Sequence, residues 1–148
     1  MKKKNNLIIY AHPNKNGHCG KYLEEVEFYL KSQNLDYDII DLYEESFNPV
    51  LGLNEFYINN KDLKMSDDVL DYQKKISEYY NIIFIYPNWW NGVPAILKGF
   101  FDRVLVPEFA YKYLNGLPIG LLKDKKAIVL TSTGGPKIYD FFLWGLNF

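Results

Sequence analysis

Three short runs of branched and aromatic apolar residues constrain the fold of this chain more than any other feature of its sequence. They cover residues 7–11, 82–86 and 127–131, and each has the length and composition of a β-strand that is buried on both faces. A fourth run, residues 37–42, is mixed in polarity, which is typical of a strand at the edge of a sheet. Strands separated by helical stretches in one short chain indicate crossover connections and a parallel sheet.

Apolar residues at helical spacing fill the segments between these runs. The pattern predicts helices over residues 20–31, 66–80 and 94–104. Ser66 is a suitable N-cap for the second helix, and Pro94 suits the first turn of the third. The side chains expected to face the core are Tyr22, Val26, Tyr29 and Leu30 in the first helix and Val69, Tyr72, Ile76 and Tyr79 in the second.

The alternation of strands and helices predicts an α/β fold of three layers, α/β/α, with a flavodoxin-like parallel sheet of order 2-1-3-4. After residue 131 we expect one more helical stretch, residues 138–148, and no fifth strand. The 148 residues suffice for one domain, 1–148, and are too few for two domains of ordinary size.

Composition and charge exclude several functional classes. The net charge of −1 offers no broad basic surface, which argues against nucleic-acid binding. A single cysteine, Cys19, excludes an internal disulfide, and two histidines without a nearby carboxylate cluster argue against a metal site. The apolar run at residues 7–11 is too short for a signal peptide or a membrane span, so we expect a cytoplasmic protein without membrane insertion.

Three loops lie at the carboxyl ends of the predicted strands, which is where an open parallel sheet binds its ligands. The first, residues 12–20, is polar and leads into a helix N-terminus, where backbone N–H groups favour a phosphate. It contains neither GxGxxG nor the P-loop motif, which disfavours a Rossmann dinucleotide site and an NTPase. The third, residues 131–136, combines hydroxyl side chains with a glycine pair, whose backbone can approach a ligand closely. Taken singly, the residues of each of these two loops are explained at least as well by an ordinary strand-to-helix connection that binds no ligand.

The second loop, residues 87–94, is the most informative because two tryptophans directly follow a buried strand. Trp89 and Trp90 cannot both point into one core, so at least one is expected at the open end of the sheet. The alternative is that both rings cover the sheet edge or contact another subunit. A phosphate-binding loop, an aromatic wall and a group of N–H donors together match a planar heterocycle with a phosphate tail, such as a flavin.

Residues 86–111, YPNWWNGVPAILKGFFDRVLVPEFAY, resemble the signature of the flavodoxin-like NAD(P)H dehydrogenase (quinone) family, the relatives of DT-diaphorase. Residues 11–26 and 130–139 resemble the first and third loops of the same family. The resemblance implies a homodimer that carries a flavin, either FAD or FMN. It also implies a ping-pong reaction in which hydride passes from NADH or NADPH to the flavin and then to a quinone-like acceptor.

The resemblance also assigns roles to individual residues. It implies a catalytic role in hydride transfer for Tyr139, and a place for Tyr111 and Tyr113 in the substrate site of the neighbouring subunit. The cofactor-binding residues would be His12, Asn16, Gly17, His18 and Cys19 at the phosphates or ribityl chain, Pro87, Asn88, Trp89, Trp90 and Asn91 at the isoalloxazine, and Thr133, Gly134 and Gly135 at its pyrimidine edge.

The sequence departs from the family pattern in three places. Gly17, His18 and Cys19 stand where Ser-Phe-Asn is usual, so the backbone would carry more of the phosphate binding. The histidine usual several residues beyond Tyr139 is missing, so a Tyr–His relay cannot be carried over. Family members usually continue through another helix and a fifth strand. Two alternatives therefore stay open: a flavin-binding ancillary subunit docked on the cytosolic domain of a glutathione-gated potassium-efflux transporter, and a truncated paralogue without cofactor.

Overall fold

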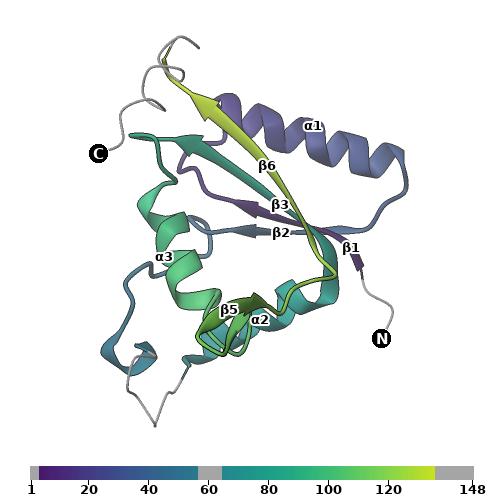
Figure 1. Cartoon of the computed structure of the whole chain (residues 1–148). Helices are drawn as coiled ribbons and strands as arrows, with labels where there is room; N and C mark the ends of the chain where they lie inside the picture. The colour runs from purple at the N-terminus through teal and green to yellow at the C-terminus, as the bar shows by residue number, and fades with distance from the viewer. Residues whose placement is uncertain (1–3, 57–64, 136–148) are drawn as a thin grey trace.

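The computed structural model describes residues 4–56 and 65–135, and in this part of the chain four strands form one parallel sheet (Figure 1). The order is β2-β1-β3-β6. This confirms the predicted flavodoxin-like arrangement, because β6 is the fourth expected strand. The expectation that this strand is buried on both faces was wrong for the described residues: Ile128 and Val129 are exposed, because β6 lies at the edge of the sheet and pairs only with β3 there. The helical stretch expected over residues 138–148 lies outside the described residues. The strands are β1 (Lys4–Tyr10), β2 (Tyr37–Asp41), β3 (Tyr79–Asn88) and β6 (Lys126–Thr133).

Strands β1 and β3 are the inner strands of the sheet, and β1 has a partner on each side. Ile8 is paired with Ile39 of β2 and with Ile83 of β3. Residues 7–10 are fully buried because helices cover both faces of the sheet. β2 pairs only with β1 among the described residues, as expected for a strand of mixed polarity.

Helix α1 (His18–Ser32) covers one face of the sheet, and α2 (Asp67–Glu78) and α3 (Ala95–Val104) cover the other (Figure 1). α2 buries Val69, Tyr72 and Ile76 as predicted. The expectation that Tyr79 belongs to this helix was wrong, because α2 ends at Glu78 and Tyr79 is buried as the first residue of β3.

The expectation for α1 was wrong in part. Leu30 is buried and Val26 partly buried as expected, whereas Tyr22 and Tyr29 are exposed, because Cys19 and Leu23 take their place against the sheet.

A buried ion-pair network fixes the loop between β2 and α2 onto α3. The Arg103 guanidinium donates two hydrogen bonds of 2.7 Å to the Glu55 carboxylate and one of 2.7 Å to the carbonyl of Asn48. It also pairs with Asp68 at 3.1 Å. Ser66 stands at the N-cap of α2 as expected, but its hydroxyl donates to Glu55 and accepts no backbone N–H of the helix. A 3-10 turn, η1 (Leu53–Glu55), carries this glutamate.

A β-hairpin follows α3 and was not expected from the sequence. It consists of β4 (Tyr111–Leu114) and β5 (Leu117–Gly120), joined by Asn115 and Gly116 with positive φ angles of 53° and 79°. An Asn-Gly pair between two short runs is the usual signal for such a turn. Because α3 runs back from the carboxyl ends of the strands, the hairpin lies at the amino edge of the sheet (Figure 1). No helix in the described residues has both the length and the apolar composition needed to cross a bilayer.

Candidate functional site

The first loop folds back against the helix that it precedes. A Cβ on Gly20 would lie 1.5 Å from the backbone oxygen of Lys15, so this position accepts no side chain. The loop is also held from within: the Tyr10 hydroxyl donates to the carbonyl of Asn14 at 3.2 Å, and the Asn16 N–H donates to the Asn14 side chain at 2.8 Å. The glycine thus sets how closely residues 12–17 approach the start of α1.

The N-terminus of α1 has the electrostatic character of an anion site. Gly17 is its N-cap and makes no side-chain cap, and the first turn contains no acidic residue. The N–H groups of the first turn and the helix dipole are therefore not neutralised by a side chain of the helix itself. An anion with several acceptor oxygens, such as a phosphate, suits this position.

The second loop is shorter than the sequence suggested. Pro87 and Asn88 continue β3 and pair with Ser132 and Thr133 of β6. Proline is tolerated here because β1, which pairs only as far as Ile85, has already ended on that side. The expectation that Pro87 and Asn88 belong to the loop was wrong, although both still lie at the carboxyl edge.

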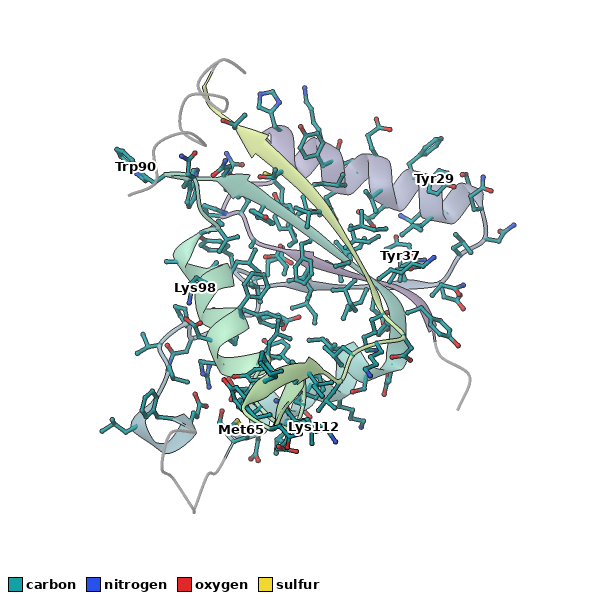
Figure 2. The ribbon with its side chains drawn as sticks, in the orientation of Figure 1. Tyr29, Tyr37, Met65, Trp90, Lys98 and Lys112 are labelled. Atoms are coloured by element: carbon teal, nitrogen blue, oxygen red, sulfur yellow. The ribbon has the colours of Figure 1, made fainter. Side chains whose placement is uncertain are left out.

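A tight turn presents the two tryptophans. The backbones of Trp89 and Gly92 exchange two hydrogen bonds of 3.0 Å, and Trp90 and Asn91 between them have φ angles of 54° and 58°. Two central residues with positive φ define a type I′ turn. Trp90 is 102% exposed and projects into solvent (Figure 2), whereas Trp89 is 44% exposed and its ring lies 5.9 Å from that of His12.

One buried polar atom at this edge lacks a partner. The side-chain oxygen Oδ1 of Asn88 is buried and makes no hydrogen bond with the described residues. Buried acceptors are almost always satisfied, so an orphan at the end of a central strand indicates a ligand-binding position. A planar ring with polar groups along its edge fits such a group.

The third loop is joined to the first by one side-chain contact. The Cys19 Sγ lies 3.3 Å from the hydroxyl oxygen of Ser132, across 113 positions of sequence. Thr133 ends β6, and the Gly135 N–H donates to its hydroxyl at 3.4 Å. Because Cys19 is 2% exposed, its thiol packs inside and any ligand meets its backbone. Sequence reasoning did not single out Ser132; its place directly before Thr133 was the available signal.

The structure thus brings most of the predicted cofactor-binding residues to one edge of the sheet. Those on the three loops lie where β1, β3 and β6 end. Tyr111 and Tyr113 do not join them, because they belong to β4 at the opposite edge, with their rings 5.7 Å apart. Tyr139 lies outside the described residues.

Residues 4–144 match a protein family described by its flavodoxin-like fold. The chain belongs to the flavodoxin-like NAD(P)H quinone oxidoreductase family. A solved NAD(P)H:quinone oxidoreductase from Methanothermobacter marburgensis superimposes with a TM-score of 0.84 and is 29% identical, over 97% of this chain and 73% of that one.

Two curated relatives show the same family likeness in sequence. An uncharacterized NAD(P)H oxidoreductase of Haemophilus influenzae is 40% identical over 123 residues, which cover 82% of this chain and 60% of the relative. An FMN-dependent NADH:quinone oxidoreductase of Coprothermobacter proteolyticus is 33% identical over 135 residues, covering 87% of this chain and 67% of the relative. The chain spans little more than half of the length of the first curated relatives that it matches.

Proposed function

We propose that this chain binds a flavin at the carboxyl edge of its sheet and acts as an NAD(P)H:quinone-type oxidoreductase. The observation that carries the proposal is that three loops lie at the carboxyl edge of the sheet, where the buried Asn88 oxygen lacks a hydrogen-bond partner among the described residues. One loop offers an uncapped helix N-terminus, one an exposed tryptophan turn and one a Gly-rich backbone. The FMN-dependent relative makes FMN the first flavin to test, with FAD as the second.

Each loop has a separate task in this proposal. The N–H groups at the start of α1 bind the phosphate, and Trp89 and Trp90 pack on the ring. Asn88 and the segment from Thr133 to Gly135 face its polar edge. A bound flavin supplies a redox group that takes hydride from NADH or NADPH and gives it to a quinone-like acceptor. Fixed N–H donors at the polar edge stabilise negative charge there and so favour reduction.

We also propose that the active unit is a homodimer in the cytoplasm. Tyr111 and Tyr113 lie at the edge of the sheet that is opposite to the three loops of their own chain. Tyr113 is 60% exposed, so its ring is available to a neighbour. In this proposal the two tyrosines line the substrate site of the other subunit, and Tyr139 supports hydride transfer.

The test is a flavin titration followed by a turnover assay. The purified chain is expected to quench FMN or FAD fluorescence with saturation, and then to oxidise NADH or NADPH when menadione is supplied. Turnover should follow the flavin-bound fraction. Failure to bind either flavin contradicts the proposal as a whole. Flavin binding without any turnover contradicts the enzymatic part and favours an ancillary, flavin-binding subunit.

A further inference from the structure

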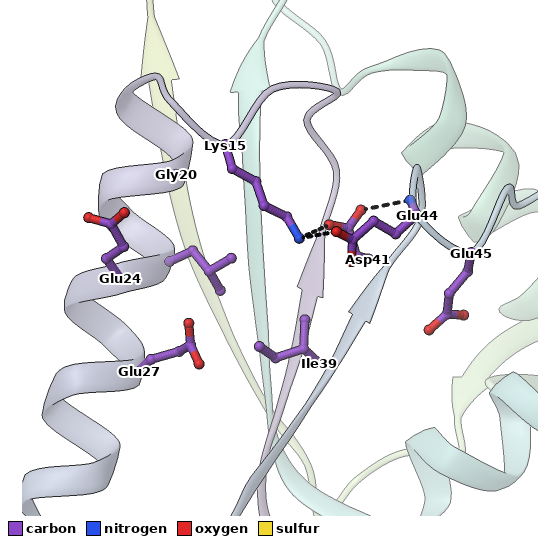
Figure 3. A pocket seen from close by; sticks show the side chains of 9 residues that line it. Lys15, Gly20, Glu24, Glu27, Ile39, Asp41, Glu44 and Glu45 are labelled. Atoms are coloured by element: carbon purple, nitrogen blue, oxygen red, sulfur yellow. Dashed lines mark hydrogen bonds and ion pairs between the residues drawn. The ribbon is translucent and has the colours of Figure 1, made fainter.

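Lys15 belongs to the first loop, yet its side chain turns away from the helix N-terminus and reaches the end of β2 (Figure 3). Its Nζ lies 2.8 Å from Oδ2 of Asp41 and 2.7 Å from a carboxylate oxygen of Glu44. The side chain of Lys15 is 45% exposed, whereas that of Asp41 is 6% exposed. The lysine therefore bridges a loop of the candidate site to a buried anion on a neighbouring strand.

Asp41 is itself held in place. Its Oδ1 accepts the backbone N–H groups of Tyr43 and Glu44 at 3.1 and 3.2 Å. The next residue, Leu42, donates its N–H to the carbonyl of Tyr10 at 3.0 Å, which fastens the end of β2 to the end of β1. The anion that receives Lys15 is thus part of the rigid sheet.

The backbone of Lys15 is fixed on its other side. Its carbonyl oxygen occupies the space that a Cβ of Gly20 would need, in the first turn of α1. Residues 13–16 are otherwise exposed, so few tertiary contacts hold this loop. A lysine is charged at neutral pH, and hydrogen bonds with Asp41 and Glu44 raise the pKa of Lys15 further.

From this geometry we infer that Lys15 is a positioning residue, whose bridge to Asp41 and Glu44 holds residues 12–17 in the conformation that leaves the start of α1 open to a phosphate. The inference rests on the proposed flavin site. It identifies Lys15 as the group that sets the affinity of that site for the phosphate end of the flavin. A loop ordered in advance loses less conformational entropy when a ligand binds. The ring end of the flavin, at Trp89 and Trp90, meets this loop only through the contact between His12 and Trp89, so the effect on the ring end should be the smaller one.

The test compares FMN with riboflavin, which has the same ring and no phosphate. Lys15→Met is expected to raise the Kd for FMN about tenfold and to change that for riboflavin less than about twofold. Lys15→Arg should restore FMN binding, because a guanidinium keeps the bridge. In the flavin-free protein, amide hydrogen exchange in residues 12–17 should be faster for Lys15→Met than for the wild type. Lys31→Met, which removes a solvent-exposed lysine paired with Glu27 at 3.5 Å, is the matched control and should leave all of these values unchanged.

Asp41→Asn separates positioning from a direct attraction between Lys15 and the phosphate. The variant removes a negative charge near the site, so direct electrostatics alone would tighten FMN binding. It retains the Oδ1 acceptor but replaces the oxygen that binds Lys15, so a broken bridge should weaken FMN binding. This variant also tests the inference if Lys15→Met does not fold.

Several outcomes would overturn the inference. They are equal FMN affinity of Lys15→Met and the wild type, an equal loss of affinity for FMN and riboflavin, and tighter FMN binding by Asp41→Asn. In each of these cases the wild type still binds flavin, so the proposed function stands. A wild type that binds neither FMN nor FAD overturns the proposed function and the affinity effect together, while the exchange of residues 12–17 still shows whether the bridge orders the loop.

Discussion

At the scale of single residues, the buried ion pairs of Arg103 are the electrostatic interactions on which the fold depends most. The side chains of Arg103 and Glu55 are 5% and 7% exposed and form a two-point ion pair. Removing the Glu55 charge leaves the buried guanidinium with Asp68, whose side chain is 46% exposed, as its remaining carboxylate partner. Glu55→Gln should therefore lower the free energy of unfolding at pH 7 by about 3–5 kcal/mol, measured by urea denaturation. Asp68→Asn is the control. It should lower the free energy of unfolding less than Glu55→Gln does, because the Asp68 side chain is 46% exposed.

The same ion pair predicts how stability depends on pH. The Arg103 guanidinium lowers the pKa of Glu55 from 4.5 to about 2. A carboxyl whose pKa is lowered by folding stabilises the native state fully above its unfolded pKa, and this contribution is lost as the pH falls through the folded value. The difference in the free energy of unfolding between the wild type and Glu55→Gln should shrink as the pH falls from 4.5 towards 2. A difference that stayed constant from pH 7 to pH 2 would contradict this account.

Trp90 combines full exposure with a φ angle of 54°, a conformation that is unfavourable for a large side chain. Such strain is usual where a residue serves a ligand. Trp90→Gly should raise the stability of the flavin-free protein by up to about 1 kcal/mol. It should weaken FMN binding by about 1–3 kcal/mol, because the ring is lost. Trp90→Ala loses the ring without relieving the strain, so it should weaken binding and bring no gain in thermal stability. Unchanged FMN affinity in both variants would make Trp90 a structural residue.

At the scale of elements, α3 docks on its own chain through Gly99. A Cβ there would meet the carbonyl oxygen of Pro49 at 2.1 Å and its Cβ at 2.4 Å. Alanine favours a helix by about 1 kcal/mol relative to glycine, but overpacking costs about 1–3 kcal/mol. Gly99→Ala should therefore destabilise the protein in thermal unfolding. Lys98→Ala, which loses only an exposed pair with Asp102, is the control. A stabilised Gly99→Ala would mean that Pro49 yields to the new methyl group.

The sequence predicted the elements that local patterns determine. Buried strands such as β1 are continuous apolar runs, and α2 follows a helical period. The side of α1 that faces the sheet was misjudged in part. Leu30 is buried as predicted, but Tyr22 and Tyr29, which are apolar enough to resemble core residues, are exposed, and Leu23 packs against the sheet instead. The hairpin at Asn115 was missed because its strands are short and mostly exposed.

The candidate site was predictable as a set of loops but not as a set of contacts. Loop positions follow from the rule that ligands bind at the carboxyl ends of parallel strands. The Cys19–Ser132 contact and the bridge from Lys15 to Asp41 depend on tertiary register, which periodicity does not encode. Likewise, no pattern in the sequence predicts that Arg103 pairs with Glu55, 48 positions away.

At the scale of the whole molecule, the two ends of the sheet carry different parts of the proposed active site. The three loops of the proposed flavin site lie at the carboxyl edge, and the tyrosine pair of β4 lies at the amino edge. One chain therefore cannot complete the site by itself if Tyr113 contacts the substrate. In a two-fold dimer the hairpin of each subunit can lie at the carboxyl edge of the other subunit's sheet and complete the site there.

Mixed dimers test this arrangement directly. Tyr113→Ala should impair quinone reduction without altering FMN affinity, and Trp90→Ala should impair flavin binding. When the two variants are unfolded together and refolded as an equal mixture, half of the dimers contain one chain of each kind. If Tyr113 acts across the interface, one site of each mixed dimer carries both lesions and the other carries none. Mixing should then restore about one quarter of wild-type sites. If Tyr113 acts within its own chain, every site carries one lesion and mixing restores nothing, which would confine the active site to a single subunit.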